Sequence, residues 1–328
     1  MPDALRSAFE AALQAKPLAD REIAAVVAAV PERLAELLSL AAQIRERHFG
    51  RSVSFCAIVN ARSGDCPEDC AFCAQSAHHA TAAPRYGFLD PAVIAAAAER
   101  MKSCGARRFS VVTSGKTLDA DDFERLKAAV AAVAQTGLCA DVSAGLLEAD
   151  QVRELAAIGL SGVHHNLETS RRFFPRVCTT HDYEEDVSAV RAAVAAGAYV
   201  CSGGLFGLGE DWDDRVDLAL TLRGLSVHSV PVNFLIPIPG TPLEHRPRLD
   251  PAEALGIVAL YRFLLPDRHV RVCGGRQGVL GPKSARQVLA AGASALMLGD
   301  FLTTPGSLAA EDLADAAALG LEPQQETP

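Results

Sequence analysis

The chain has 328 residues, enough for two ordinary domains or one large barrel, and its 49% hydrophobic and 22% charged residues are normal for a globular protein. Forty acidic residues against 31 basic ones give a net charge of -9, which argues against a general nucleic-acid-binding surface because such surfaces need clustered lysine and arginine. No apolar stretch is long enough to span a membrane and the N-terminus has no apolar signal segment, so we expect a cytoplasmic protein that acts on small molecules. An odd number of cysteines, nine, indicates thiols, metal ligands or catalytic groups rather than a disulfide framework.

Alanine-rich segments with a period of 3.6 predict helices over residues 3–48. From residue 52 onwards, short apolar segments alternate with helical patterns, which is typical of parallel βα units. The predicted strands lie at 52–60, 107–114, 138–145, 161–168, 198–206, 229–237, 269–275 and 295–300.

An open doubly wound sheet and a closed eight-stranded barrel both satisfy this alternation. We prefer an α/β fold of the closed (β/α)8 type, because eight such repeats occupy about 250 residues. The expected domains are an N-terminal helical extension at 1–48, the barrel at 49–305, and a short C-terminal helix and tail at 306–328.

Cys66, Cys70 and Cys73 form a C-x3-C-x2-C motif in the loop directly after the first predicted strand. Thiolates at this spacing can converge on zinc or on an iron–sulfur cluster. A zinc site would need a fourth ligand, such as His78 or His79, and structural zinc usually uses paired C-x2-C or Cys-His elements, so we rank the cluster higher. Three ligands on a four-iron cluster leave one iron open to a substrate.

On this motif the chain resembles the radical S-adenosylmethionine enzymes, whose cysteine loop holds a 4Fe-4S cluster. The segments "ARSGDCPEDCAFCAQS", "HHNLETS", "VCSGGLFGLGE", "VNFLIPIPGTP", "GGRQ" and "FLTTPG" follow the order seen in the biotin synthase family, across roughly residues 45–306. The resemblance implies conversion of dethiobiotin to biotin, with sulfur supplied by an auxiliary iron–sulfur cluster inside the barrel. It also implies an electron donor such as flavodoxin or ferredoxin, iron–sulfur assembly proteins, and a homodimer.

The resemblance suggests which residues contact S-adenosylmethionine: Glu168, Gly203, Gly204 and His181. Glu168 stands where the family usually has aspartate, and a carboxylate can accept hydrogen bonds from ribose hydroxyls. The glycines lie at a strand end where missing side chains would let a ligand approach the backbone. His181 replaces an arginine expected to face the cofactor carboxylate, so its role depends on protonation of the imidazole.

The substrate contacts implied by the resemblance are Asn166, Asn233, Thr303 and Thr304. Asn166 and Glu168 are two residues apart on a predicted strand and should face the same side. An amide can bond to a ureido ring, and the two threonines resemble the family's carboxylate-binding pair. His164 stands where the family more often has asparagine, and an ordinary hydrogen-bonded histidine is preferred to a ligand.

The auxiliary cluster site is where the sequence departs from the family pattern. Residue-by-residue transfer puts Ser110 and Asp141 at two positions where thiolate ligands are expected, and oxygen ligands suit cluster iron poorly. Cys201 and Arg276 match the remaining two ligands and are the expected catalytic residues. We expect Cys201, Cys273 and Cys139, in that order, to supply thiolates to a non-standard cluster together with Arg276, with Cys178 the weakest candidate. Cys56 and Cys104 have the pattern of small buried hydrophobic residues.

The same evidence leaves two other functions open. A related radical enzyme could rearrange or methylate a small molecule without inserting sulfur. A non-enzymatic iron–sulfur carrier is less favoured, because it would not need the substrate-pocket segments.

Overall fold

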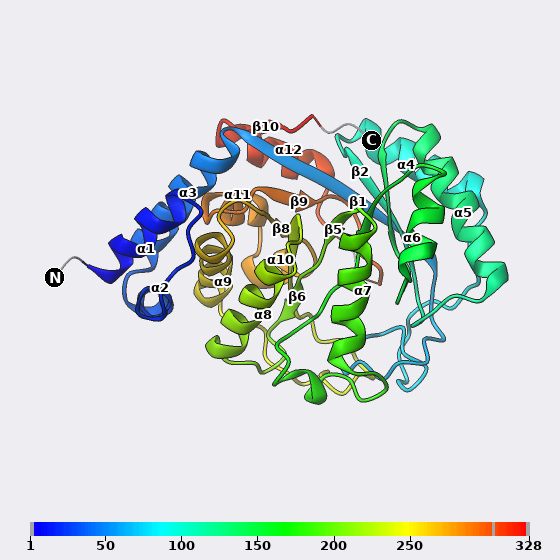
Figure 1. Cartoon of the computed structure of the whole chain (residues 1–328), viewed down its shortest axis with the longest axis horizontal. Coiled ribbons are helices and arrows are strands. Elements are labelled where there is room, and N and C mark those ends of the chain that lie inside the picture. Colours follow the sequence, from blue (N-terminus) through cyan, green and yellow to red (C-terminus); the bar gives the residue numbers. More distant parts are fainter. Residues whose placement is uncertain (1–2, 304–305, 326–328) are drawn as a thin grey trace.

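A closed parallel barrel forms the body of the protein (Figure 1), seen in a computed structural model that describes residues 3–303 and 306–325. Neighbouring strands pair in parallel, and β9 pairs with β1 to close the barrel. β5 and β6 both pair with β7 and together take one place, so eight positions surround the barrel. The strands are β1 (Ser52–Arg62), β2 (Arg108–Thr113), β3 (Cys139–Ser143), β4 (Leu160–His164), β5 (Tyr199–Cys201), β6 (Gly204–Phe206), β7 (Ser229–Phe234), β8 (His269–Val272) and β9 (Ala295–Met297). The predicted closed barrel is confirmed.

Helices cover the outside of the barrel and begin where the sequence places capping residues. The side chains of Asp90, Asp119 and Asp250 each accept a hydrogen bond from a backbone N–H of the first turn. Proline at the first position further favours two of these helices, since its fixed φ suits a helix start. The helices are α4 (Pro91–Ser103), α5 (Ala120–Gln135), α6 (Ala149–Ala156), α7 (Tyr183–Ala195), α8 (Trp212–Gly224), α9 (Pro251–Leu264), α10 (Arg276–Leu280) and α11 (Ser284–Ala290).

Three helices precede the barrel: α1 (Ala4–Leu13), α2 (Asp20–Glu32) and α3 (Leu34–Phe49). Both α2 and α3 lie against α9, at the left of the view in Figure 1. After β9 the chain forms α12 (Ala309–Ala318) and the short β10 (Glu322–Pro323), which pairs with the start of β1. Across the described residues, none of the helices combines the length and apolar character needed to cross a bilayer.

The barrel interior is unusually polar for a packed core. Ser110 on β2 is paired with Asp141 on β3, and His164 on β4 is paired with Cys201 on β5. Arg108 and Arg271 are also buried there, 5% and 2% exposed. A polar interior in an otherwise apolar fold points to a site built along the barrel axis, above which the loops at the strand carboxyl ends converge.

Candidate active site

The three motif cysteines come together in the loop after β1. Cys73 N–H donates to the carbonyl of Cys70 (2.9 Å) and Cys66 N–H to that of Gln75 (3.1 Å), which folds the motif back on itself. All three cysteines line one cavity, here called the loop cavity, which also contains Glu68 and Ser114. Burial raises the pKa of Cys73 to about 11, so this thiol needs a metal or cation to become a thiolate at neutral pH. The donor set fits a cluster held by three thiolates.

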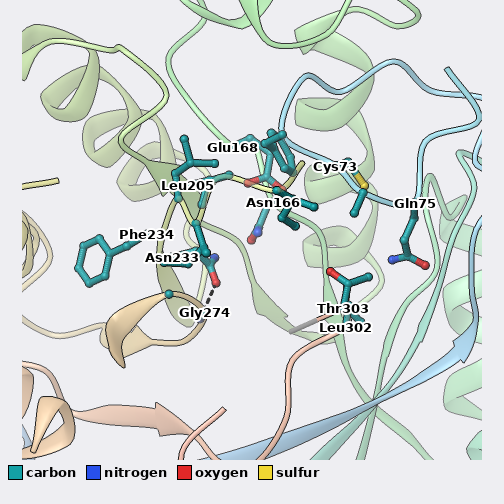
Figure 2. A pocket seen from close by; sticks show the side chains of 16 residues that line it. Cys73, Gln75, Asn166, Glu168, Leu205, Asn233, Phe234, Gly274, Leu302 and Thr303 are labelled. Atoms are coloured by element: carbon teal, nitrogen blue, oxygen red, sulfur yellow. Dashed lines mark hydrogen bonds between the residues drawn. The ribbon is translucent and has the colours of Figure 1, made fainter. Parts of the chain in front are cut away.

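Two further cavities adjoin the loop cavity at the carboxyl ends of the strands. The outer cavity contains Cys73, Asn166, Asn233 and Thr303 (Figure 2), and the inner cavity contains His164 and Cys273. Phe72, Glu168 and Leu302 line all three cavities. The cavities therefore form one continuous site that runs from the cysteine loop toward the barrel interior.

Asn166 and Asn233 are held in place by neighbouring backbone. Asn166 Oδ1 accepts from the N–H of Gly203 (3.2 Å), while Asn233 donates to the carbonyl of Gly204 (3.2 Å) and accepts from the N–H of Gly274 (3.0 Å). In Figure 2 the two amides lie with Glu168 between the Cys73 side and the Gly274 side of the cavity. Each fixed amide retains a further hydrogen or lone pair for a ligand.

Glu168 shares the cavity with Asn166, but not because both belong to one strand. β4 ends at His164, and Glu168 lies beyond it with φ 62°, a left-handed conformation that is costly for a residue other than glycine. Burial raises the pKa of this carboxyl to about 7, although a hydrogen bond from Asn166 opposes the shift. A strained, desolvated carboxyl that lines all three cavities is suited to binding ligand hydroxyls.

Gly203 and Gly204 lack side chains for a different reason from the predicted approach of a cofactor. A Cβ on Gly203 would lie 2.0 Å from the carbonyl oxygen of Pro231, and one on Gly204 would lie 2.5 Å from that of Glu168. The missing side chains therefore admit neighbouring backbone, so the reason given for these glycines is wrong, while their contact with the cofactor stays a prediction. Their backbone groups act indirectly by fixing Asn166 and Asn233.

His181 lines the loop cavity, but its imidazole is already occupied. Nδ1 lies within hydrogen-bonding distance of Glu68 (2.5 Å) and Cys178 (3.2 Å), and Nε2 lies 3.3 Å from Asp186. Hydrogen bonds with Asp186 and Cys178 raise the pKa of His181 to about 11. Protein groups engage both nitrogens of His181, and its contact with a cofactor carboxylate stays a prediction.

A group of three thiols lies at the inner end of the site. Cys273, at the end of β8, packs against Cys56 of β1 and Met297 of β9. Burial and then the charges of Cys56 and Cys201 raise the pKa of Cys273 well above its usual value, which is consistent with all three thiols facing the barrel interior. Burial also raises the pKa of Cys201 to about 11. Cys56, interpreted from the sequence as a buried hydrophobic residue, thus joins Cys201 and Cys273.

Asp141 occupies a ligand position of the familiar auxiliary cluster, and the structure uses it differently. Its carboxylate forms two hydrogen bonds with the guanidinium of Arg108 (2.6 and 2.8 Å) and a third with His164 Nε2 (3.1 Å). Although burial opposes the shift, the Arg108 charge lowers the pKa of Asp141 to about 2. The adjacent Ser110 hydroxyl has no hydrogen-bond partner among the described residues. The familiar ligand set does not fit here, but the unpartnered hydroxyl is consistent with an occupant of the barrel interior.

Of the two arginines near Cys273, Arg271 and not Arg276 crosses the inside of the barrel. Arg271 donates to Ser54 (2.7 Å) and Ser229 (3.3 Å) across the inside of the barrel, and its charge lowers the pKa of Cys201 against the effect of burial. Arg276 starts α10 and is held by the carbonyl of Met297 (2.9 Å), by Ser307 and by an ion pair with Asp312. These partners, together with the carbonyl of Cys273 (3.4 Å), occupy both terminal nitrogens of Arg276, so Arg271 is the better candidate for an auxiliary ligand.

The remaining candidates are spread along the site. Cys139 begins β3, opposite Arg108 and two residues before Asp141, at the end of the strand away from the cavities. Cys178 lies against Cys70 and His181 in the loop region instead of near Cys201. Thr303 lines the outer cavity, whereas Thr304 lies outside the described residues. Neither Cys139 nor Cys178 is therefore brought into the group of Cys56, Cys201 and Cys273.

Sequence reasoning missed Arg271 and undervalued Cys56. Arg271 stands two residues before Cys273, and Cys56 lies in the first predicted strand. Side chains two apart on a strand face the same way, so alternation along β8 could have identified Arg271. No comparable signal distinguishes Cys56 from a packing residue.

The fold and the cysteine loop define a class of protein. Residues 62–222 match the family model described as the radical SAM superfamily, and residues 231–322 match the Biotin and Thiamin Synthesis associated domain. Among solved structures, methylornithine synthase has a TM-score of 0.84 at 19% identity, covering 97% of each chain. The FeFe-hydrogenase maturase HydG from Carboxydothermus hydrogenoformans has a TM-score of 0.81 at 17% identity, covering 98% of this chain and 79% of that one. These neighbours show the fold, a closed (β/α)8 barrel.

Curated relatives specify the family. The chain is 48% identical over 302 residues to a biotin synthase of Nitratidesulfovibrio vulgaris, which covers 92% of this chain and 83% of the relative. It is 46% identical to the biotin synthases of Trichlorobacter lovleyi and Heliobacterium modesticaldum, covering 93% and 96% of those proteins. The chain belongs to the biotin synthase family.

Proposed function

We propose that this protein converts dethiobiotin to biotin by radical-mediated insertion of sulfur, with S-adenosylmethionine as the radical source. The observation that carries the proposal is the continuity of the site. The loop cavity with Cys66, Cys70 and Cys73 adjoins a cavity with two fixed amides, and the adjoining inner cavity contains Cys273, which packs against Cys56. Family membership supports the same reaction.

The residues of this site have different roles. Cys66, Cys70 and Cys73 hold a 4Fe-4S cluster, and Glu168 accepts hydrogen bonds from the ribose hydroxyls of S-adenosylmethionine. When bound, the 4Fe-4S cluster supplies the electron for cleavage of S-adenosylmethionine, and the auxiliary cluster supplies sulfur. The apolar side chains of Phe72 and Leu302, which line the cavities, limit the access of water and so protect a reactive carbon radical.

Asn166 and Asn233 bind the ureido ring of dethiobiotin. Both amides are pre-oriented by backbone hydrogen bonds, so little side-chain entropy is lost when a planar urea binds between them. Thr303 and Thr304 are proposed to bind the substrate carboxylate, which matches the position of Thr303 on the outer cavity.

The auxiliary cluster is proposed to take thiolates from Cys56, Cys201 and Cys273, with Arg271 beside them. Sulfur donors suit cluster iron, and the arginine charge favours the thiolate form of Cys201. Cys139 is retained only as a weaker candidate because it begins its strand at the far end. We further propose a cytoplasmic homodimer that receives electrons from a flavodoxin or ferredoxin and clusters from the iron–sulfur assembly proteins.

The radical cluster is tested by single replacements. Cys66→Ala, Cys70→Ala and Cys73→Ala should each abolish reductive cleavage of S-adenosylmethionine, because each removes a ligand. The measurement is 5'-deoxyadenosine formation under reducing, anaerobic conditions, with Cys104→Ala as the matched control that should retain activity. Undiminished product in any of the three ligand variants contradicts the assignment.

Sulfur insertion is tested on the wild-type protein after anaerobic reconstitution. Iron and sulfide should exceed the content of one 4Fe-4S centre, and mass spectrometry should find biotin from dethiobiotin. Cys201→Ala and Cys273→Ala should lose the additional iron and the biotin while still cleaving S-adenosylmethionine. A fully loaded protein with one cluster and no sulfur-containing product would favour a radical mutase or methylase instead.

A further inference from the structure

His164 is a partly buried histidine whose position the proposed reaction does not explain. It ends β4 and is paired with Cys201 of β5. Residues paired across neighbouring parallel strands send their side chains to the same face of the sheet. His164 lines the inner cavity together with Cys273. The imidazole is therefore beside Cys201 and lines the same cavity as Cys273.

The hydrogen bonds of His164 determine which ring nitrogen is free. Asp141 makes a two-point salt bridge with Arg108, at 2.6 and 2.8 Å, so its carboxylate is ionised and can only accept. His164 Nε2 lies 3.1 Å from the same carboxylate and must therefore donate to it. In the neutral imidazole the other nitrogen, Nδ1, then carries the lone pair.

A histidine that donates one ring N–H to a carboxylate is the usual form of a histidine metal ligand, because the carboxylate fixes the tautomer and the ring orientation. Imidazole suits iron, and histidine replaces cysteine on one iron of Rieske clusters. The three thiols of Cys56, Cys201 and Cys273 leave one ligand position to be filled in a four-ligand set.

The departures from the family pattern are also connected in space. Asp141 stands where the family has a cluster thiolate, and it is Asp141 that orients His164, itself a replacement for asparagine. We propose that His164 is the fourth protein ligand of the auxiliary cluster, bound through Nδ1 beside Cys56, Cys201 and Cys273. This assignment rests on the proposed function, since it requires the auxiliary cluster.

The test is a nitrogen measurement that does not depend on activity. The full chain carrying Cys66→Ala, Cys70→Ala and Cys73→Ala is reconstituted anaerobically so that only the auxiliary cluster remains, and is then reduced. Pulsed EPR should find a strongly coupled nitrogen whose frequency changes when the protein is grown with 15N-histidine. Selective labelling separates histidine nitrogen from that of Arg271.

Two variants complete the experiment. His164→Asn, which restores the more common residue of the family, should lose the labelled coupling, whereas His165→Asn should retain it because His165 bonds Asp186 (2.8 Å) instead. His164→Cys should keep the cluster and lower its midpoint potential, because a thiolate carries a negative charge that imidazole lacks.

The outcomes separate the two proposals. A second cluster without histidine coupling in the labelled protein overturns the role of His164 and leaves sulfur donation standing. Loss of coupling in His165→Asn but not in His164→Asn also overturns it. If the protein fully loaded with iron holds no second cluster, both this ligand and the auxiliary sulfur donor are wrong. The labelled protein that keeps His164 shows by itself whether a histidine nitrogen binds the cluster, even if a variant at position 164 folds poorly.

Discussion

Asp141 illustrates how one buried residue can redefine a site. Its carboxylate neutralises Arg108, whose guanidinium lies 3.9 Å from the ring centre of Tyr199. Two charges taken out of water are tolerated only while they remain paired, and removal of either leaves the other desolvated. A carboxylate at this position therefore stabilises the barrel interior instead of binding iron.

Asp141→Asn should accordingly destabilise the fold by about 3–5 kcal/mol, because the buried Arg108 would lose its countercharge. Urea unfolding followed by circular dichroism measures this change. The double variant Arg108→Met with Asp141→Leu should recover most of the loss, since neither charge then remains buried. A loss under 1 kcal/mol for Asp141→Asn would show that water reaches Arg108.

His269 gives a pH dependence at the same scale. Burial, and then the charges of Arg271 and Arg262, lower the pKa of His269 to about 3, whereas an unfolded histidine titrates near 6.5. The unfolded chain therefore binds more protons between these values, and stability falls as the pH drops from about 6.5 toward 3.

Between pH 7.5 and 5.5 this histidine should cost on the order of 1 kcal/mol. We expect His269→Phe, which preserves a ring against Phe49, to show a smaller loss over that interval. The free energy of urea unfolding at the two pH values is the measurement. An equal pH dependence in the variant and the wild type would assign the effect to other groups.

At the scale of the elements, α10 links the two sides of the outer cavity. The turn before it contains Gly274, whose N–H holds Asn233, and Gly275, where φ is 81° and a Cβ would lie 1.9 Å from the carbonyl oxygen of Phe234. Arg276 follows and is bound to Met297 and Ser307. Those two residues flank the segment that carries Leu302 and Thr303, so one guanidinium positions both sides of the cavity.

Arg276→Lys should therefore raise the KM for dethiobiotin about tenfold, equivalent to about 1.4 kcal/mol, because a lysine cannot bond to three partners in the same geometry. Steady-state kinetics measure the KM, and iron counting checks that the variant keeps its clusters. Asp312→Asn should also raise the KM for dethiobiotin. Loss of the auxiliary cluster signal in Arg276→Lys would restore Arg276 as a cluster ligand.

At the scale of the whole molecule, the N-terminal helices and the barrel share one hydrophobic core. Leu37 and Ile44 of α3 are fully buried and belong to the same cluster as Leu260 of α9 and Val270 of β8. The helices that precede the barrel therefore stabilise it directly. The single tryptophan, Trp212, begins α8 and reports on the barrel side of this core.

Leu37→Ala should destabilise both parts together, by about 2–5 kcal/mol, because it leaves a cavity in the shared core. The midpoint of unfolding should decrease by the same amount in the variant whether it is followed by Trp212 fluorescence or by circular dichroism. A shift in circular dichroism alone would mean that the N-terminal helices unfold independently of the barrel.

The sequence by itself determined the elements and the loop chemistry. Alternating apolar segments specify strands and helices locally, and eight such units over about 250 residues favour a closed barrel over an open sheet. The spacing of Cys66, Cys70 and Cys73 needs only a short loop, so their convergence could be predicted without tertiary information. Asn166, Asn233 and Thr303 were implied by the resemblance to the biotin synthase family, and all three line the outer cavity.

Only the tertiary structure decided the barrel interior, because contacts there join strands far apart in the chain. Cys56 and Cys273 come together because β1 closes on β9, next to β8, which no local pattern reports. Arg271 and Arg276 are five residues apart, yet the tight turn at Gly274 and Gly275 sends one into the barrel and the other toward Asp312. Asp141 is buried, paired with Arg108 and hydrogen-bonded to His164. Its role was decided by these neighbours, because the free energy of burying and pairing a carboxylate depends on its surroundings and not on residue type alone.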